Sequence, residues 1–382
     1  MTDRAKPLSE RTYQMSKSIK LALVIMLVLL MAGSGALFLI AVTHPSSAYD
    51  PSKVKLDVDL RTREEILTCA YKVYGDQNQN QWVAKTLIKN TGKIPVYDFK
   101  IWYKVRDFTD WTSGEEYPVI SPGETVRDYC WPALAGEKVK EITTKTPVEL
   151  VLKYEYKGLK KPVEDYKTIY LLGRNDFIFS SMKEEDRLTF ADNFDNYLFI
   201  AAFITPNEGT TKSFANKVAG GLETRTNDND AYQAFLNCFN TLRTHGVKYI
   251  QEPSGFWSGK EAQYVQYPRD TIERKSGTCI DLAICMSALM EAVGIKSYVA
   301  LLPGHAIPLI QLPGSGDIIP IESTFMDQQY ALSHFPGTTS PDVTADECVG
   351  IAQGQIEQAS SEGQLVLVDP EYWWKAGVMP SW

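Results

Sequence analysis

The sequence lacks the short motifs that mark the commonest metal and cofactor sites. Its 382 residues contain no H-E-x-x-H or C-x-x-C spacing, which are patterns that place metal ligands side by side. They also contain no glycine-rich loop of the kind that cradles a phosphate. No internal repeat is evident, so the sequence gives no sign of a repeat architecture. We therefore expect neither a metal nor another cofactor.

Basic residues are outnumbered by acidic ones. The chain has 39 Lys and Arg against 47 Asp and Glu, a formal net charge of −8, and it shows no basic cluster beyond its first residues. This balance argues against a nucleic-acid binder. With 44% hydrophobic and 23% charged residues, the composition is that of a folded chain. Its length leaves room for two ordinary domains and an anchor.

Charge is missing altogether from one long stretch, residues 21–42, which is long enough to cross the hydrocarbon layer of a membrane. Residues 1–20 before it carry five basic and two acidic side chains. This asymmetry predicts a transmembrane signal anchor with a cytoplasmic N-terminus and the remaining chain outside the cell. The alternative is a cleaved secretory signal with Ser46-Ser47-Ala48 at the cutting region. A signal core is usually about 7–15 residues long, so the longer run favours retention.

Residues 43–53, rich in Pro and Ser, are predicted to be a tether. Beyond them, Val96 to Val105 and Val148 to Tyr156 alternate apolar and charged side chains, as half-buried strands do. Further strands are predicted at Lys53 to Asp59, Trp82 to Lys89 and Lys167 to Leu172. Turn signals separate these runs and no long helix is expected among them. Residues 54–175 therefore predict an antiparallel β-sandwich of the Ig-like class.

Residues 176–382 show longer, helical periods and form the second predicted domain. Helices are expected at Phe194 to Ile204, Thr211 to Leu222 and Asp230 to Arg243. The chain as a whole is thus predicted to be α+β. His334 is interpreted as a surface histidine. The aromatic tail that ends in Trp382 is expected to pack on the domain or to touch the membrane surface.

Cys279 lies in the first turn of a further predicted helix, which follows Ser276-Gly277 and ends at Gly294. Thr278 or Ser276 is the expected cap. The positive end of the helix dipole and the unpaired N–H groups there favour a thiolate, which is the form that attacks carbonyls. The apolar stripe that predicts this helix consists of Leu282, Met286, Leu289 and Val293.

Three short apolar strands are predicted after this helix. Ile295 to Leu302 runs into the turn Pro303-Gly304, His305 opens the next strand, and Ile318 to Ile321 leads to Glu322. Short links make them neighbours in an antiparallel sheet. In this order Cys279 is the expected nucleophile, His305 its base and Glu322 the acceptor that orients the imidazole. The backbone N–H of Cys279, together with a neighbouring donor, is the expected oxyanion site.

Four sequence blocks resemble the transglutaminase-like superfamily, most of all its microbial branch. They are Y-P-x-x-T-x-x-x-K-x-G-x-C-x-D-L-A from Tyr267, L-x-E-A-V-G-I from Leu289, P-G-H-A from Pro303 and I-E-S-T from Ile321. The resemblance implies a papain-like core, the triad Cys279, His305 and Glu322, and Asp281 as a structural acid. The chain departs from the branch at Thr278 and Ile280, where an acid is common, and at Glu322, where many relatives have Asp.

The resemblance implies a cysteine peptidase, amidase or acyltransferase that acts on amide bonds of proteins or peptides. The uncharged run 21–42 and the charges before it predict that this enzyme is membrane-anchored and faces outward. Water as the second substrate is slightly favoured over an amine. The alternative is an inactive envelope scaffold in which the sandwich binds and the second domain does no chemistry. As further oxyanion donors, Trp257 and the group Gln263, Gln266 and Tyr267 are candidates.

The other cysteines allow several states. Cys69 and Cys130 fall within the predicted sandwich and are either paired or buried as free thiols. Cys285 is expected to be a core thiol. Because Cys279 has to stay free, any disulfide in the second domain is expected to join Cys238 and Cys348.

Overall fold

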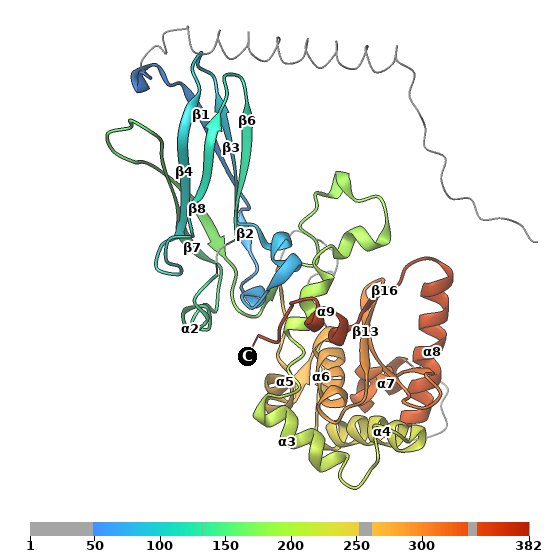
Figure 1. Ribbon diagram of the computed structural model, residues 1–382. Coiled ribbons are helices and arrows are strands. Elements are labelled where there is room, and N and C mark those ends of the chain that lie inside the picture. Colours follow the sequence, from blue (N-terminus) through green and yellow to red (C-terminus); the bar gives the residue numbers. More distant parts are fainter. Residues whose placement is uncertain (1–48, 132, 252–261, 335–341, 382) are drawn as a thin grey trace, which may run out of the picture. The chain divides into compact units, whose positions relative to one another are not determined.

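The computed structural model describes residues 49–131, 133–251, 262–334 and 342–381 (Figure 1). The predicted membrane span 21–42 lies outside them, and so does Trp257. Within the described ranges, none of the helices is both long and apolar enough to cross a membrane. The chain divides into two units, 1–53 and 54–382. Of the first, the structure describes only residues 49–53, which include the 3₁₀ turn η1 (Pro51–Lys53).

Residues 54–171 form two sheets with a shared hydrophobic core (Figure 1). One sheet has the order β1-β3-β6 and the other β2-β8-β7-β4-β5. All pairs are antiparallel except β2 with β8. A hydrogen bond of 2.7 Å from the Tyr103 hydroxyl to Thr86 Oγ1 links the two sheets inside the core. The strands are β1 (Leu56–Thr62), β2 (Glu65–Ile66), β3 (Ala84–Asn90), β4 (Val96–Val105), β5 (Glu115–Ile120), β6 (Thr125–Cys130), β7 (Thr146–Glu155) and β8 (Val163–Leu171).

Strand β4 has the bounds that its alternation predicts, but its alternation is interrupted. The pairing with β5 passes from Tyr97 to Phe99 and skips Asp98, whose φ is +53°. The register with β5 is the same on both sides of Asp98, so no residue is inserted, but the left-handed backbone at Asp98 interrupts the extended geometry and changes which side chains face inward. Val96 and Phe99 are therefore both fully buried, whereas the prediction had placed Tyr97 on the inner face. A short helix, α2 (Gly136–Val139), was not predicted at all.

The remaining chain combines helices with a four-stranded antiparallel sheet of order β15-β14-β13-β16. Its larger helices are α3 (Gly209–Val218), α4 (Asp228–His245), α5 (Pro268–Arg274), α6 (Cys279–Ala292), α7 (Gln328–His334), α8 (Ala345–Ser361) and α9 (Pro370–Lys375). The sheet strands are β13 (Ser297–Leu302), β14 (His305–Gln311), β15 (Ile318–Pro320) and β16 (Val366–Val368). Short pairs are β9 (Asp176–Phe177) with β11 (Gln263–Tyr264), and β10 (Lys248–Tyr249) with β12 (Ser276–Gly277). The 3₁₀ helices are η2 (Thr68–Ala70), η3 (Gly75–Gln81), η4 (Glu184–Asp186), η5 (Phe190–Phe194), η6 (Tyr197–Ala202) and η7 (Ser323–Met326).

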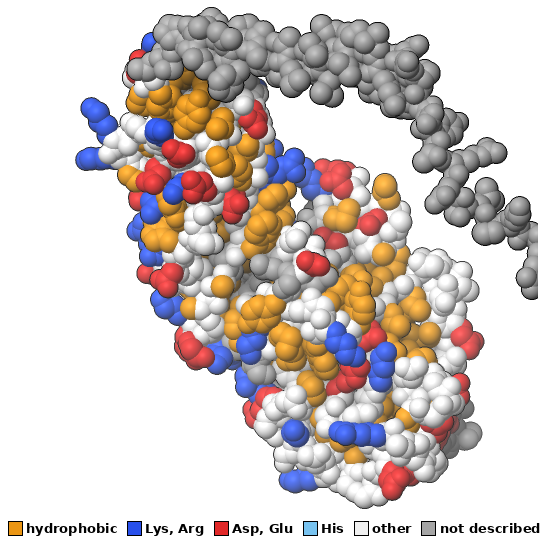
Figure 2. All heavy atoms as spheres, in the orientation of Figure 1, with side chains coloured by type: hydrophobic (Ala, Val, Ile, Leu, Met, Phe, Trp, Pro, Cys, Tyr) orange, Lys and Arg blue, Asp and Glu red, His pale blue; other side chains and the backbone are white. Residues whose placement is uncertain are grey.

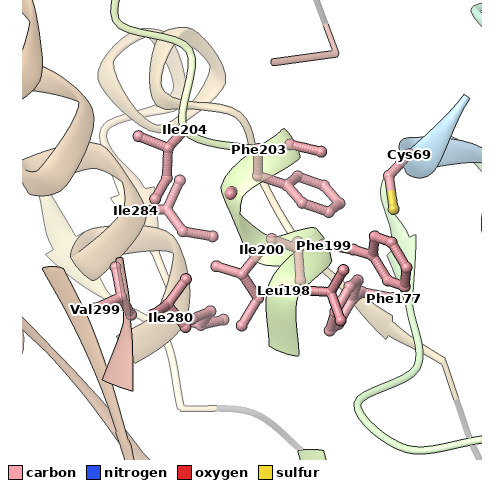
Figure 3. Close-up of a cluster of buried hydrophobic side chains, with 14 of the residues drawn as sticks. Cys69, Phe177, Leu198, Phe199, Ile200, Phe203, Ile204, Ile280, Ile284 and Val299 are labelled. Carbon is pink, nitrogen blue, oxygen red and sulfur yellow. The ribbon is translucent and has the colours of Figure 1, made fainter. Parts of the chain in front are cut away.

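Helix α6 lies at the centre of this second region. Every residue from Cys279 to Met290 is buried, so the helix is enclosed on all sides and not on one stripe as predicted. One face, with Ile280 and Ile284, belongs to a hydrophobic cluster that also contains Ile200 of η6 and Val299 of β13 (Figure 3). The opposite face, with Leu282 and Met286, belongs to a second cluster shared with α4. A helix that is apolar all round is typical of such a central position.

The predicted helix from Phe194 to Ile204 is wrong, because η5 and η6 occupy this stretch as separate 3₁₀ turns. Asn196 lies between them, and its side-chain amide donates to the Ile178 carbonyl and to Ser181 Oγ, both at 2.9 Å. Residues 198–204 are all buried and offer no polar face. Hydrogen bonds from an Asn side chain to nearby groups compete with a continuous helix. In this stretch the bonds of Asn196 accompany the break between η5 and η6.

Cys69 does not belong to the sandwich core. It lies in the cluster around Phe177 and Phe199, whereas Cys130 lies in the core of the two sheets (Figure 3). The two thiols are therefore not paired, and all six cysteines are buried and free. Cys238 and Cys348 share a cluster but form no disulfide. Cys285 is fully buried in the same cluster, and burial raises the pKa of its thiol.

The end of the chain returns to the segment before β3. Tyr74 N–H donates to the Gly377 carbonyl at 2.8 Å, and Met379 N–H donates to the Lys72 carbonyl at 3.1 Å. The Trp374 indole N–H also bonds to the Ala201 carbonyl at 3.0 Å. The aromatic tail therefore packs on the domain, which is one of the two outcomes expected for it.

Candidate active site

The local sequence fixes where α6 begins. Lys275, with a φ of +55°, ends α5, and Ser276-Gly277 forms the short strand β12. A Cβ at Gly277 would lie only 2.8 Å from the Cβ of Asp281, so this position requires glycine. Thr278 is the N-cap, as predicted, and its N–H donates to Asp281 Oδ2 at 2.9 Å. Cys279 is thus the first residue of the helix and is 4% exposed.

Asp281 ties a second segment to the start of α6. Its carboxylate also accepts from the N–H of Gln266 at 2.7 Å and from the Gln266 side-chain amide at 3.0 Å. The same amide donates to the Ser276 carbonyl at 3.1 Å. Asp281 is 1% exposed, and burial raises the pKa of its carboxyl while these N–H donors oppose the rise. The structural role that the resemblance implies for Asp281 is consistent with this set of bonds.

His305 and Glu322 lie close together at one end of the strands β14 and β15. His305 opens β14, whose neighbour β15 ends two residues before Glu322. His305 Nε2 lies 2.7 Å from Glu322 Oε2. The other carboxylate oxygen, Oε1, accepts from the Thr324 hydroxyl at 2.6 Å and from the Thr324 N–H at 3.1 Å. Glu322, with 1% exposure, is thus held at both oxygens, and its greater length over Asp is accommodated.

The electrostatics of this pair favour a charged imidazole. Burial alone would lower the pKa of His305, but the Glu322 carboxylate and the neighbouring Cys279 raise it to about 10. Burial would raise the pKa of Glu322, yet His305 and Thr324 hold it below its usual range. Because Nε2 is engaged by Glu322, Nδ1 is the ring nitrogen left for Cys279. The structure thus brings together the three residues that the sequence singled out.

The side chains considered as oxyanion donors are placed differently. The Gln266 amide is committed to Asp281 and Ser276. The Tyr267 ring is stacked on Phe203 in the core, with ring centroids 4.9 Å apart. Gln263 pairs with Phe177 in the short sheet of β9 and β11. The backbone N–H of Cys279, at the open end of α6, remains the donor that the described residues supply.

Tyr330 is a neighbour of the site that sequence reasoning missed. Burial raises the pKa of this phenol, and the charges of Glu322 and Cys279 add to the rise. Its ring packs against Tyr249 at 4.5 Å and against His334 at 4.1 Å between centroids. A tyrosine on a short helix gives no signal in a single sequence. His334 itself is exposed, and the described residues contain no group of side chains able to hold a metal ion.

No protein family and no curated protein matches the sequence. Among solved structures, one similar chain is a candidate cysteine protease from Cytophaga hutchinsonii, with 14% identity, a TM-score of 0.24, and 75% of this chain and 80% of that chain covered. Another is a candidate protease from Parabacteroides distasonis, with 9% identity, a TM-score of 0.23, and coverage of 63% and 66%. A third is a family 76 glycoside hydrolase from Bacteroides thetaiotaomicron, with 11% identity, a TM-score of 0.17, and coverage of 79% and 63%. Similarity this low supports no argument about activity.

Proposed function

We propose that this protein is a cysteine enzyme of the transglutaminase-like type that attacks amide bonds of proteins or peptides. One observation carries the proposal. A cysteine at the first position of a buried helix interacts electrostatically with a histidine whose Nε2 is 2.7 Å from a buried carboxylate oxygen. Nucleophile, base and orienting acid in this relation define thiol acyl transfer. The pairing with Glu322 accounts for the orientation of the ring.

The proposed reaction begins when the Cys279 sulfur attacks the carbonyl carbon, with the thiol proton held by His305. The backbone N–H of Cys279 then stabilises the oxyanion. When the C–N bond breaks, the imidazolium gives its proton to the departing amine and a thioester remains on Cys279. A water molecule, deprotonated by His305, attacks the thioester. The products are a carboxylic acid and the free thiol, and Glu322 supports the imidazolium in both steps.

We favour water over an amine as the second substrate, because no feature of the described site marks an amine-binding group. We further propose that residues 21–42 anchor the chain in the membrane, with residues 54–382 outside the cytoplasm. The uncharged run and the basic residues before it support this topology. The region 54–175 is proposed to be an Ig-like domain, which its two packed sheets, antiparallel except for the pair β2 and β8, support.

A thiol-reactive, peptide-like probe applied under reducing conditions tests the proposal. We expect it to label Cys279 in the full-length chain, with the labelled residue identified by mass spectrometry. Cys279→Ala removes the label. Cys285→Ala is the matched control, because this second cysteine of α6 is buried in the core, and it leaves labelling unchanged. Absence of label on Cys279 in the folded wild-type protein would refute the enzyme proposal.

A further inference from the structure

A cavity of about 670 Å³ lies in the two-sheet region, where the edge strand β5 of one sheet faces the edge strand β6 of the other. The loop 106–114 closes one side. This volume is within the range of about 300–1,000 Å³ that is typical of small-ligand sites. None of the residues proposed for catalysis lines it. The cavity therefore needs an explanation that is independent of the proposed enzyme.

A buried carboxylate, Asp128 of β6, lines this cavity. Asp128 is 6% exposed, and its Oδ1 accepts from the Tyr117 hydroxyl at 3.0 Å. Burial raises the pKa of Asp128, the phenols of Tyr103 and Tyr117 oppose the rise, and the nearby Glu115 adds to it. No lysine, arginine or histidine in the described chain forms an ion pair with it. A desolvated carboxylate without a cation is costly, so a cationic group entering the cavity would be stabilised there.

The walls of the cavity are aromatic. The Tyr129 and Trp131 rings are stacked with centroids 5.3 Å apart and an interplanar angle of 21°, and Trp131 remains 37% exposed. Trp111 lies on the loop and is also 37% exposed. Aromatic faces attract ammonium and guanidinium groups. The region already shows this, because the Lys153 ammonium lies 4.4 Å from the Trp111 centroid and 4.7 Å from that of Trp102.

The loop that carries Trp111 is held in place by backbone bonds. Thr112 N–H donates to the Tyr103 carbonyl at 2.9 Å, and the Tyr103 N–H donates to Thr112 Oγ1 at 3.0 Å. Thr109 makes a similar pair of contacts with Val105. The wall is therefore fixed before any ligand arrives, and a fixed site loses less conformational entropy on binding.

The charges around the cavity are mostly negative. Of the charged side chains that line it, Asp110, Glu115 and Asp128 are acidic and Arg127 is basic, and Arg127 bonds to the Tyr129 hydroxyl at 3.3 Å; Lys153, which is not in the lining, lies against Trp111. Elsewhere the visible face of the protein mixes acidic and basic side chains (Figure 2). A neutral sugar would use the rings but would gain little from a buried carboxylate. An ammonium group uses both features.

We propose that this cavity binds the side-chain ammonium of a lysine presented by a partner polypeptide. The ammonium lies against the aromatic walls and pairs with Asp128, while Asp110 and Glu115 add to the attraction at the rim. The lysine methylenes contact the rings. This site is separate from Cys279 and stands whether or not the chain is an enzyme.

Titration of the full-length chain with a blocked tri-lysine peptide tests the proposal, with tryptophan fluorescence and calorimetry as readouts. The same peptide with acetylated lysines keeps the length and removes the charge, and we expect it to bind at least about 10-fold more weakly. Asp128→Asn should also weaken binding of the lysine peptide about 10-fold. Glu115→Gln, at the surface, should weaken it less and keeps the test valid if Asp128→Asn does not fold.

Asp165→Asn is the matched control, because it removes an exposed carboxylate from β8 of the same region, outside the cavity. It should leave binding unchanged. Equal binding of the two peptides, binding by neither, or equal losses from Asp165→Asn and Glu115→Gln would overturn the proposal. So would a neutral oligosaccharide that displaces the lysine peptide and binds Asp128→Asn as tightly as the wild type.

Discussion

Two buried carboxylates, Glu322 in the region of helices and the four-stranded sheet and Asp128 in the two-sheet region, have opposite surroundings. In the α/β region, Glu322 faces His305 at 2.7 Å, and the imidazole holds the pKa of the carboxyl below its usual range. In the two-sheet region, Asp128 accepts from the Tyr117 hydroxyl and forms no ion pair within the described residues, and burial raises its pKa. The comparison teaches that burial alone does not decide whether the pKa of a carboxyl group is raised or lowered. Glu322, which is paired with the His305 imidazole, is suited to orient that side chain. Asp128, which has no paired cation among the described residues, is suited to receive a cation from outside.

The largest expected effect comes from removing the cation on the Glu322 side. His305→Ala should slow labelling of Cys279 by the thiol probe by roughly 10²–10⁴-fold, the usual contribution of a general base. Glu322 would then be a buried carboxylate without a partner, like Asp128. The rate of labelling is measured by mass spectrometry over time, with His334→Ala, an exposed histidine, as the control. Similar rates for the two variants would remove His305 from the mechanism.

The second largest effect on the labelling rate of Cys279 is expected from changing Glu322. Glu322→Gln should slow labelling by about 10- to 100-fold and leave residual activity, because an orienting residue contributes less than the nucleophile or the base. The amide keeps the shape of the side chain but cannot neutralise the imidazolium. Wild-type rates in this variant, measured by the same time course, would exclude Glu322 from the site.

The stability of the same pair should depend on pH. The pKa of His305 is raised from 6.5 to about 10, so its contribution to stability is fully present below about pH 6.5 and is lost as the pH rises through about 10. On the acid side, the lowered pKa of Glu322 means that its contribution is lost as the pH falls below its ordinary value of 4.5. The difference in free energy of unfolding between wild type and Glu322→Gln, measured by urea denaturation, should therefore become smaller as the pH rises through about 10 and as it falls below 4.5. A difference that is constant with pH would contradict the ion pair.

A smaller effect tests what holds the carboxylate. Thr324→Val removes the hydroxyl that donates to Glu322 Oε1 at 2.6 Å and keeps the backbone donor. We expect a loss of about 1.5–3 kcal/mol in unfolding free energy, the range for a hydrogen bond to a charged group. Thr344→Val, at an exposed helix cap, is the comparison and should cost less, about 1 kcal/mol. Equal losses would show that burial does not strengthen the bond.

The smallest effect is expected at Cys285. Cys285→Ala should lower the free energy of unfolding by about 1 kcal/mol, because the thiol is fully buried and its removal leaves a small cavity. The labelling rate of Cys279 should stay unchanged. A selective loss of labelling at unaltered stability would give Cys285 a part in the chemistry.

The order of elements around Cys279 could be predicted from sequence because each depends on local signals. Thr278 as cap, Gly294 with a φ of +80° after the helix, and His305 at the start of a strand all lie where the pattern places them. The full burial of α6 could not be predicted, because it depends on two clusters assembled from distant segments. Nor could Tyr330, whose place beside Glu322 follows from the tertiary fold.

The same distinction, between local sequence signals and contacts made by the tertiary fold, explains the predictions that were wrong. The left-handed backbone at Asp98 has no signature in the alternation of β4, and the break at Asn196 depends on acceptors at Ile178 and Ser181. The location of Cys69 in a core made mostly by residues beyond 172 has no local signature. The roles of Cys279, His305 and Glu322 in catalysis remain predictions, which the labelling experiments address.

The hydrogen bonds of Lys72 and Tyr74 with Met379 and Gly377 also affect how the protein folds during its synthesis. A ribosome makes residues 72–74 long before it makes their hydrogen-bond partners, Gly377 and Met379. The segment 67–73 therefore lacks part of its core, around Cys69 and Val73, until residues 377–379 have been made. The two sheets can close during translation, since all their strands lie before residue 172. The region that carries Cys279 is completed only once residues 377–379 are available, so a nascent chain that is shorter than this lacks a finished reactive site.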